Sequence, residues 1–303
     1  MIEVKNLVKK YGDHTAVDHL SFHVDKGQIY GFLGPNGAGK STTMNIMTGY
    51  IASTSGEVLI DGHNILEEPE AAKKCIGYLP EQPPLYFDMT VAEYLKFAAE
   101  LKKVPKNERE TQIEQVMELT GITAMANRLI KNLSKGYKQR VGLAQAILGY
   151  PEIIILDEPT VAVDPQSRNK ILEGIMELNR NGATIVYTSH YMEEVEQICS
   201  RIAIMDGGKN LALGTASELK KLIKNTETIN IELLNLPDEI MDEIKNLPHV
   251  YNITYNNNIL KIFYSGGKHN LIRVLDLLKS HNINMGRVYS EFPTLNDVFL
   301  EIT

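Results

Sequence analysis

The sequence lacks the marks of several protein classes. Its 303 residues include two cysteines, Cys75 and Cys199, and neither has a partner at the C-x-x-C spacing of a metal site, so we expect buried thiols in a reducing compartment. No apolar run approaches the roughly 18 residues of a membrane-spanning helix. The N-terminus has no long apolar segment, so we expect no secretory signal. These absences predict a soluble protein whose contact with a membrane goes through a partner.

Basic residues are also fewer than acidic ones. The chain has 31 lysines and arginines against 38 aspartates and glutamates, a net charge of −7. A protein that wraps duplex nucleic acid usually presents a basic face, so we expect no nucleic-acid partner. With 43% hydrophobic and 23% charged residues, the composition excludes a collagen-like or disordered chain. The length leaves room for one large hydrophobic core and a smaller second one.

The first 220 residues alternate β-type and α-type patterns. Short apolar runs predict strands at residues 2–4, 28–33, 57–60, 76–79, 153–156, 184–187 and 202–205. Apolar residues at helical spacing predict helices at 91–101 and 109–119, inside a helical insert at about 84–140, and further helices at 166–180 and 191–199. This alternation indicates an α/β fold with a mostly parallel sheet and helices on its faces.

The sequence pattern changes near residue 220. We expect a helix at 216–223, followed by a link at Asn225 and Thr226. Beyond it we expect strands at 229–233, 252–254 and 259–264, and helices at 238–245 and 270–279. The asparagine triplet 256–258 predicts a hairpin turn. We therefore expect two domains, residues 1–220 and a small α+β domain at 225–303.

The strongest motif is GPNGAGKS at residues 34–41, which matches G-x-x-x-x-G-K-[ST] between a strand-like run and a helix-compatible run. Glycines let backbone N–H groups wrap a polyphosphate, and the helix N-terminus adds positive potential. In this motif Lys40 reaches the terminal phosphates, and the Ser41 hydroxyl is a ligand of Mg²⁺. The residues predicted to bind the phosphates of ATP are Gly34, Pro35, Asn36, Gly37, Ala38, Gly39, Lys40, Ser41 and Thr42.

Two carboxylates follow the apolar strand at 153–156. Asp157 and Glu158 emerge at its carboxyl end, which is where open α/β sheets bind their ligands. Alone, such a pair often caps the following helix. Together with a phosphate loop it predicts a hydrolysis site, in which Asp157 joins the Mg²⁺ shell and Glu158 polarises the attacking water.

Residues 133–140, LSKGYKQR, precede that strand and resemble the L-S-G-G-Q signature of the ATP-binding subunits of ABC transporters. The resemblance covers nearly all of residues 1–220 and implies a P-loop NTPase of ABC type, with a mixed sheet core, an antiparallel β subdomain and a helical insert. It also implies roles for single residues, as follows. Tyr11 stacks on adenine, Gln82 is the Q-loop glutamine that contacts Mg²⁺, Asp164 is the D-loop aspartate, and His190 is the switch histidine that senses the γ-phosphate.

The resemblance further implies how the subunit works. Ser134 and Gly136 of the signature would contact the γ-phosphate held by a second copy, so that ATP closes a head-to-tail homodimer and hydrolysis opens it. Lys135 and Tyr137 replace a glycine and a glutamine of the family pattern, which bears on the affinity of that dimer. The insert would contact a separately encoded integral-membrane permease. The implied cofactors are ATP and Mg²⁺, and the implied location is cytoplasmic, on the inner face of the cell membrane.

The C-terminal ending, EFPTLNDVFLE, is similar to that of ABC-2 type exporters, although Leu295, Val298, Phe299 and Ile302 also make it a plain amphipathic helix. Three alternatives stay open. A non-transport ABC ATPase acting on ribosomes or DNA usually has two nucleotide domains, a coiled-coil arm or zinc-binding cysteines. A regulator that binds ATP but barely cleaves it would be expected to lack Glu158. An importer subunit differs only in the direction of transport.

Overall fold

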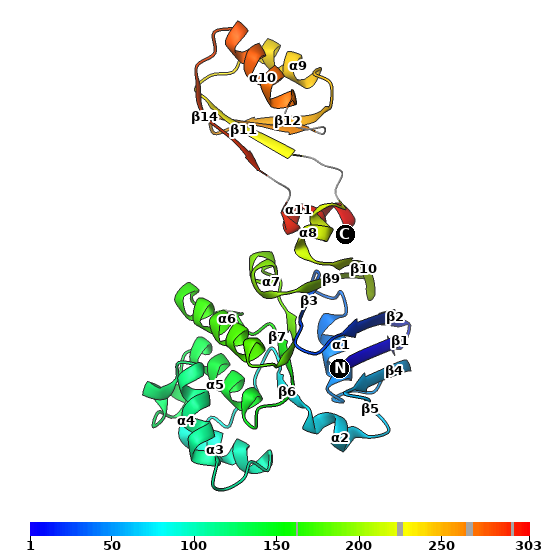
Figure 1. Cartoon of the computed structure of the whole chain (residues 1–303), viewed down its shortest axis with the longest axis vertical. Helices are drawn as coiled ribbons and strands as arrows, with labels where there is room; N and C mark the ends of the chain where they lie inside the picture. The colour runs from blue at the N-terminus through cyan, green and yellow to red at the C-terminus, as the bar shows by residue number, and fades with distance from the viewer. Residues whose placement is uncertain (162, 223–226, 265–268, 292–293) are drawn as a thin grey trace. The chain divides into compact units, whose positions relative to one another are not determined.

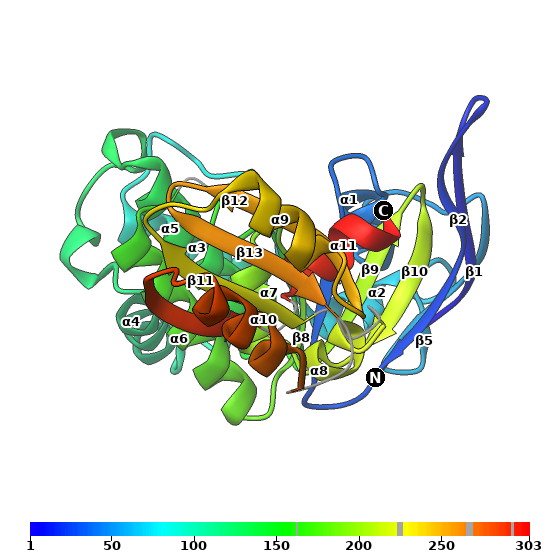
Figure 2. The same cartoon turned by 90° about the horizontal axis from the view of Figure 1, so that it is seen from above.

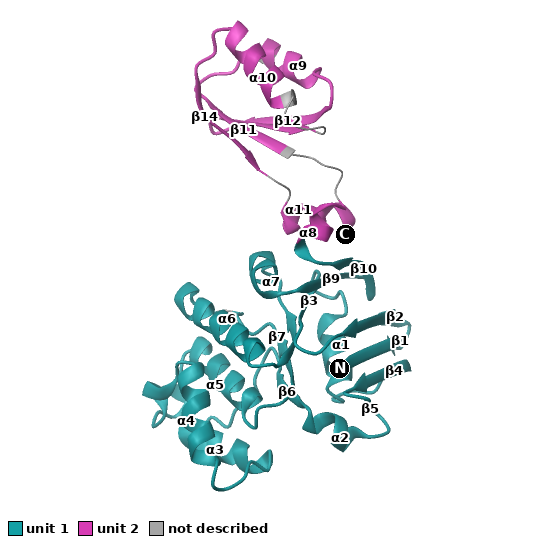
Figure 3. Ribbon diagram, in the orientation of Figure 1, with its two compact units in different colours: residues 1–216 teal, residues 217–303 magenta. Residues whose placement is uncertain are grey.

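A computed structural model describes the chain from Met1 to Thr303, except residues 162, 223–226, 265–268 and 292–293. The chain forms two compact units, Met1–Ala216 and Ser217–Thr303 (Figures 1 and 3). Among the described residues, no helix combines the length and the apolar character needed to cross a bilayer. Both cysteines are free thiols, and Cys199 is buried as expected, whereas Cys75 is partly exposed.

A six-stranded sheet forms the centre of the first unit, in the order β10-β9-β3-β8-β7-β6. The strands are β3 (Ile29–Leu33), β6 (Ile76–Leu79), β7 (Ile153–Asp157), β8 (Thr184–Thr188), β9 (Arg201–Asp206) and β10 (Lys209–Gly214). All neighbours are parallel except β10, which pairs antiparallel with β9. Every residue of β3, β7 and β8 is buried, which explains why these strands read as continuous apolar runs.

Helices and a second sheet flank this centre. Three helices, α3 (Val91–Leu101), α4 (Arg109–Leu119) and α5 (Lys135–Ile147), pack on one another, and α5 also contacts β6. The remaining helices of the unit are α1 (Lys40–Met47), α2 (Pro69–Lys74), α6 (Pro165–Arg180) and α7 (Met192–Ile198). Figures 1 and 2 both show α3–α5 on the opposite side of the parallel sheet from strands β1 and β2.

The second sheet is antiparallel, in the order β2-β1-β4-β5, with β1 (Ile2–Tyr11), β2 (His14–Val24), β4 (Ser55–Ile60) and β5 (His63–Asn64). It joins the parallel sheet through an aromatic cluster, because Phe22 of β2 lies 5.4 Å from Tyr30 and 5.0 Å from Phe32 of β3, centroid to centroid. The sequence predicted no strand at 14–24. Register shifts along the β1–β2 pair and a left-handed residue, His19 (φ 52°), break the alternation that would have marked it.

The second unit is a four-stranded antiparallel sheet in the order β12-β13-β11-β14, with two helices between its strands. Its elements are α8 (Ala216–Lys220, which begins at the boundary), β11 (Glu227–Leu233), α9 (Asp238–Lys245), β12 (Val250–Asn256), β13 (Ile259–Tyr264), α10 (His269–Ser280), β14 (Met285–Glu291) and α11 (Leu295–Ile302). The βαββαβ order is that of a split βαβ fold. Its core gathers residues of β11, α9 and α10, such as Ile231, Ile244 and Leu278.

The turn, strand and helix predictions for the C-terminal residues can be compared with the structure of this unit. Asn257 (φ 51°) and Asn258 (φ 64°) turn the chain between β12 and β13, as the triplet predicted. Strand β14 was not predicted, because most of its residues are exposed and its apolar residues do not alternate. The helix predicted at 216–223 is shorter, ending at Lys220. The link at Asn225 and Thr226, and Phe292 and Pro293 of the C-terminal ending, lie outside the described residues.

Candidate active site

A cavity of about 630 Å³ opens at the carboxyl ends of β3, β7 and β8. It is the place where an open α/β sheet binds its ligand. The residues that line it are Tyr11, His14, Ala16, Gly34, Pro35, Asn36, Gly37, Gly39, Lys40, Ser41, Thr42, Glu81, Glu158, Val161 and His190. The phosphate loop, one of the two carboxylates and the histidine therefore share one cavity, although they come from distant parts of the sequence.

The loop between β3 and α1 needs glycine for two separate reasons. Gly39 has φ 97°, and a Cβ on it would lie 2.5 Å from the carbonyl oxygen of Ala16. At Gly34, a Cβ would lie 2.3 Å from the carbonyl oxygen of Met205. Gly39 is the N-cap of α1, and its missing side chain leaves the first N–H groups of the helix free of a side-chain cap. Such N–H groups, at the positive end of the helix dipole, are suited to bind phosphate oxygens.

Lys40 supplies a cation beside these N–H groups. Its ammonium donates to the carbonyl oxygens of Gly34 (2.7 Å) and Pro35 (3.1 Å), and the side chain is almost fully buried. Burial lowers the pKa of Lys40, while the negative charges of Glu158 and Asp157 oppose that shift. The ammonium is thus held inside the loop that would surround a polyphosphate.

Ser41 lines the cavity, and Asp157 is buried directly behind it. The Ser41 Oγ lies 3.4 Å from Asp157 Oδ1, and the buried Thr188 hydroxyl donates to the same oxygen at 2.6 Å. Among the described residues, no group of three or more His, Cys, Asp and Glu side chains is gathered to hold a metal alone. A hydroxyl and a carboxylate nevertheless fit Mg²⁺, which usually takes one or two protein oxygens and completes its shell with phosphate oxygens and water.

Glu158 and His190 face each other across the ends of β7 and β8. The distance from Glu158 Oε2 to His190 Nδ1 is 2.7 Å, although the two residues are 32 positions apart. Glu158 has a left-handed backbone (φ 51°), which is uncommon for a residue other than glycine. Its N–H donates to the Thr188 hydroxyl at 2.9 Å, which holds this conformation. A buried carboxylate paired with a half-exposed imidazole can orient a water molecule for attack on a phosphate.

Other residues predicted for the site lie outside the cavity. Gln82 is exposed, and its neighbour Glu81 lines the cavity instead. Ser134 is the N-cap of α5 and accepts from the Tyr137 N–H at 3.4 Å, with Gly136 in the first turn of the same helix. Asp164 is the N-cap of α6, where hydrogen bonds from Ser167 lower the pKa of its carboxyl. Ser134, Gly136 and Asp164 therefore contribute nothing to the cavity of their own chain.

Tyr11 lies at the rim of the cavity, 51% exposed, with the Lys9 ammonium 5.0 Å from its ring centroid. A flat ring at the rim is free to stack on a base. Ala38 and Asp157 are buried beside the cavity without lining it.

Sequence reasoning missed the hydroxyl and carboxylate groups behind the site. Thr188 contacts both Asp157 and the backbone of Glu158, and Glu194 is buried with three hydroxyl groups around it. The signal for Thr188 was its place directly after the strand predicted at 184–187, two residues before His190. Glu194 looked like one of several acidic residues on a surface helix, so no sequence signal separated it from its neighbours.

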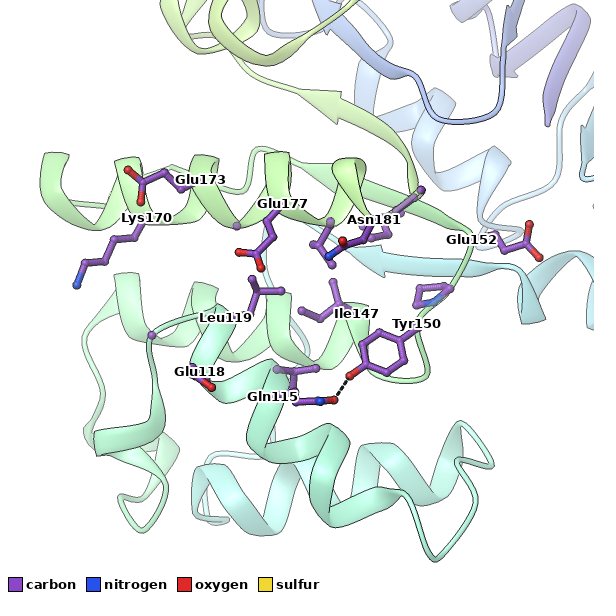
Figure 4. Close-up of a pocket in the computed structure, with 18 of the residues that line it drawn as sticks. Gln115, Glu118, Leu119, Ile147, Tyr150, Glu152, Lys170, Glu173, Glu177 and Asn181 are labelled. Atoms are coloured by element: carbon purple, nitrogen blue, oxygen red, sulfur yellow. Dashed lines mark hydrogen bonds between the residues drawn. The ribbon is translucent and has the colours of Figure 1, made fainter.

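A larger cavity, about 940 Å³, lies between α4, α5 and α6 (Figure 4). Leu119 and Ile147 contribute apolar surface, and the carboxylates of Glu173 and Glu177 come from α6. It lies near the amino ends of β7 and β8, away from the phosphate loop, and none of the predicted site residues lines it. Chemistry rather than size therefore makes the smaller cavity the candidate site.

Comparisons with known proteins agree with this geometry. A family model described as ABC transporter matches residues 17–161, and another, described as ATP-binding protein DrrA1-3-like, C-terminal domain, matches residues 214–303. The chain is 38% identical over 306 residues to the linearmycin resistance ATP-binding protein LnrL of Bacillus subtilis (strain 168), covering 100% of this chain and 98% of that protein. It is also 38% identical over 227 residues to the probable multidrug ABC transporter ATP-binding protein YbhF of Escherichia coli (strain K12), covering 75% of this chain and 39% of that protein.

Solved structures show the same likeness. The chain is similar to an ATP-binding subunit of an ABC transporter, with a TM-score of 0.69 and 30% identity over 73% of this chain and 92% of that one. It is also similar to a dimeric ATP-binding cassette in a post-hydrolysis state with ADP and Pi bound, with a TM-score of 0.66 and 27% identity over 71% of this chain and 98% of that one.

Proposed function

This chain belongs to the ATP-binding subunits of ABC transporters, which hydrolyse ATP with Mg²⁺, and from that premise we propose that it powers export through a separately encoded membrane permease. Members of this family dimerise and act with membrane-spanning partners. Two similarities support the direction of transport, since one relative is a resistance protein and another a probable multidrug transporter protein. On this proposal the chain works in the cytoplasm, held at the inner membrane face by the permease.

The observation that carries the proposal is the Glu158–His190 pair, 2.7 Å apart, in the cavity that Ser41 and the phosphate loop also line, with Asp157 buried behind Ser41. In our assignment, the loop N–H groups and Lys40 stabilise the charge that develops on the transferred phosphoryl group. Ser41 and Asp157 would hold Mg²⁺, which would supply positive charge beside the phosphates of ATP. Glu158 polarises the attacking water, and His190 orients it relative to the γ-phosphate.

The proposal also assigns the parts of the chain. Residues 1–220 would be the ATPase domain, with the helical subdomain at about 84–140 contacting the permease, and 225–303 an accessory domain. Ser134, Gly136 and Asp164 would act on the nucleotide of a second copy in a homodimer, which is consistent with their absence from the cavity of their own chain. Gln82 would link the permease contact to Mg²⁺ and the γ-phosphate, and Tyr11 would stack on the adenine ring.

Phosphate release and light scattering test this proposal on the full chain. We expect Glu158→Gln to lower the turnover of MgATP by about 10²- to 10⁴-fold, because it removes the carboxylate that acts as the general base. The variant should dimerise when ATP is added, since the phosphate loop is unchanged. Glu173→Gln, which changes an exposed carboxylate of the other cavity, is the matched control and should behave as wild type.

Three outcomes would contradict parts of the proposal. Equal turnover for Glu158→Gln and wild type would remove Glu158 from the mechanism. A Glu158→Gln chain that stays monomeric at saturating ATP would contradict the action of Ser134 and Gly136 on a second copy. For the transport role, the full chain should sediment with host membranes and be released by detergent, and a chain that stays in the soluble fraction would contradict it.

A further inference from the structure

A buried carboxylate outside the predicted site joins the segments that carry the catalytic groups. Glu194 lies on α7 and is 3% exposed. Its Oε2 accepts hydrogen bonds from the hydroxyl groups of Tyr187 (2.6 Å), Thr160 (2.7 Å) and Ser189 (3.0 Å). Three hydroxyl donors that converge on one carboxylate oxygen are more than a surface glutamate normally receives, so this part of the core is organised around Glu194.

The donors come from the two segments that end in catalytic groups. Thr160 is two residues after Glu158, and Ser189 is the residue directly before His190. The Tyr187 hydroxyl reaches Glu194 from β8. Burial, assisted by the Glu194 charge, raises the pKa of Tyr187, so its hydroxyl stays protonated and able to donate. Glu194 therefore anchors the chain on both sides of the Glu158–His190 pair.

A third segment is tied to the same carboxylate. Arg168, on the first turns of α6, places its Nε 3.1 Å from Glu194 Oε1, with no aligned hydrogen bond between the two atoms. Its guanidinium also lies over the Tyr191 ring, 4.3 Å from the centroid. Since α6 begins directly after Asp164, the ion pair connects the start of this helix to α7.

The Tyr191 ring extends this connection to the switch histidine. Its centroid lies 4.1 Å from that of His190, and its N–H donates to the Ser189 hydroxyl at 3.0 Å. His190 is thus held by Glu158 on one side and by Tyr191 on the other. Because the imidazole is half-exposed, these two neighbours help to define where it points.

We propose that Glu194 is a positioning residue for ATP hydrolysis, which with Arg168 holds Glu158 and His190 in register and couples them to the helix after Asp164. The inference rests on the proposed roles of Glu158 and His190, and it adds a role for residues outside the nucleotide cavity. Its physical basis is that small displacements of reacting groups cost large factors in rate, whereas binding of the nucleotide depends on the distant phosphate loop.

The first test is Glu194→Gln in the full chain. Glutamine keeps the size of the side chain and one oxygen to accept hydroxyl protons, but it loses the charge that pairs with Arg168. We expect kcat for MgATP to fall by about 10- to 100-fold with KM changed by less than about twofold, because ground-state binding is untouched. Arg180→Gln, an exposed change at the end of α6, is the matched control and should leave both constants unchanged.

A second pair of variants separates positioning from folding. Thr160→Val removes one hydroxyl donor without changing the size of the side chain, and Thr160→Ser keeps the donor. We expect the valine variant to lose kcat and the serine variant to retain most of it, when both are assayed well below their melting temperatures. Arg168→Met should reproduce the Glu194→Gln loss, and the double variant should be little worse than either single change, since the two residues act as one unit.

The outcomes distinguish this inference from the proposed function. If wild type does not hydrolyse MgATP, the proposed function fails. If wild type hydrolyses and Glu158→Gln does not, while Glu194→Gln and Thr160→Val keep the wild-type kcat, the inference alone is overturned. It is also overturned if the valine and serine variants lose activity equally, in proportion to lost stability, since the network would then be only structural.

Discussion

The Thr188 hydroxyl is the group whose removal should damage the site most for the least change in shape. It is fully buried, donates to Asp157 Oδ1 at 2.6 Å and accepts from the Glu158 N–H at 2.9 Å. Thr188→Val replaces this hydroxyl by a methyl group of similar size. Asp157 and Glu158 then each lose a hydrogen-bond partner.

The magnitude follows from these two bonds. Leaving the Glu158 N–H buried without a partner costs about 1–3 kcal/mol, and losing a hydrogen bond to the charged Asp157 costs about 1.5–3 kcal/mol. Because the structure around the valine can relax, the two costs do not add in full, and we expect the free energy of unfolding to fall by about 3 kcal/mol. For a unit of about 200 residues, this lowers the melting temperature by about 6–12 °C.

The assay is calorimetry of the full chain, with Thr188→Ser as the matched control. Serine keeps both hydrogen bonds and loses one methyl group, which costs about 1 kcal/mol, or about 2–4 °C. The valine variant should also lose MgATP turnover, because Asp157 and the Glu158 backbone are no longer held, whereas the serine variant should keep it. Valine and serine variants that melt within about 1 °C of each other would refute the reasoning, since the hydroxyl would then contribute nothing.

Three further predictions concern other parts of the first unit. Gly174→Ala should raise the melting temperature by about 1–4 °C, since an alanine in the interior of α6 gains about 0.5–1 kcal/mol and its Cβ would lie 3.4 Å from the nearest atom, Leu119 O. A fall in calorimetry would show that Leu119 cannot adjust. Ser134→Ala should lose about 1 kcal/mol of N-cap stabilisation and weaken ATP-driven dimerisation in light scattering, while Ser134→Thr keeps both. A Ser134→Ala chain that dimerises as well as wild type would contradict the role of Ser134 on a second copy. Burial lowers the pKa of Lys102 to about 8, so the folded chain holds this proton more weakly than the unfolded chain does. Unfolding therefore takes up a proton above pH 8, and wild type should gain stability relative to Lys102→Met as the pH rises from about 8 to 10 in urea titrations, whereas a constant difference would contradict this shift.

Predictions of strands from the sequence succeeded where one physical signal dominated. Strands β3, β7 and β8 are buried on every residue, so their continuous apolar runs marked them. Strands β2 and β14 were missed for different reasons. Bulges and a left-handed His19 disturb the period of β2, and β14 keeps most of its side chains in solvent, where the sequence is under little constraint.

Prediction of the site residues likewise succeeded where the chemistry lies in one short segment and failed where it depends on tertiary contacts. The phosphate loop could be recognised because its chemistry is local, with glycines, lysine and serine in one short segment. Gln82 was predicted at the nucleotide, but Glu81 lines the cavity instead. Which of the two side chains faces the cavity depends on the conformation of the loop, and a loop has no repeating pattern of apolar residues from which that could be predicted. Glu194 could not be recognised, because its three hydroxyl donors lie 5 to 34 positions away and meet only when β8, α7 and the segment after β7 are packed together.

The sequence by itself determined the elements that carry the phosphate chemistry. Gly34, Gly39, Lys40, Ser41, Asp157 and Glu158 stand in two short segments whose local conformations follow from residue type and from the apolar strands before them. Only the tertiary structure decided which groups meet. Parallel pairing of β7 with β8 brings residues 32 positions apart to 2.7 Å, and the same pairing places Thr188 between the two carboxylate residues. The physical reason is that parallel neighbours are joined by long crossover connections, so their partners across the sheet leave no trace in local spacing.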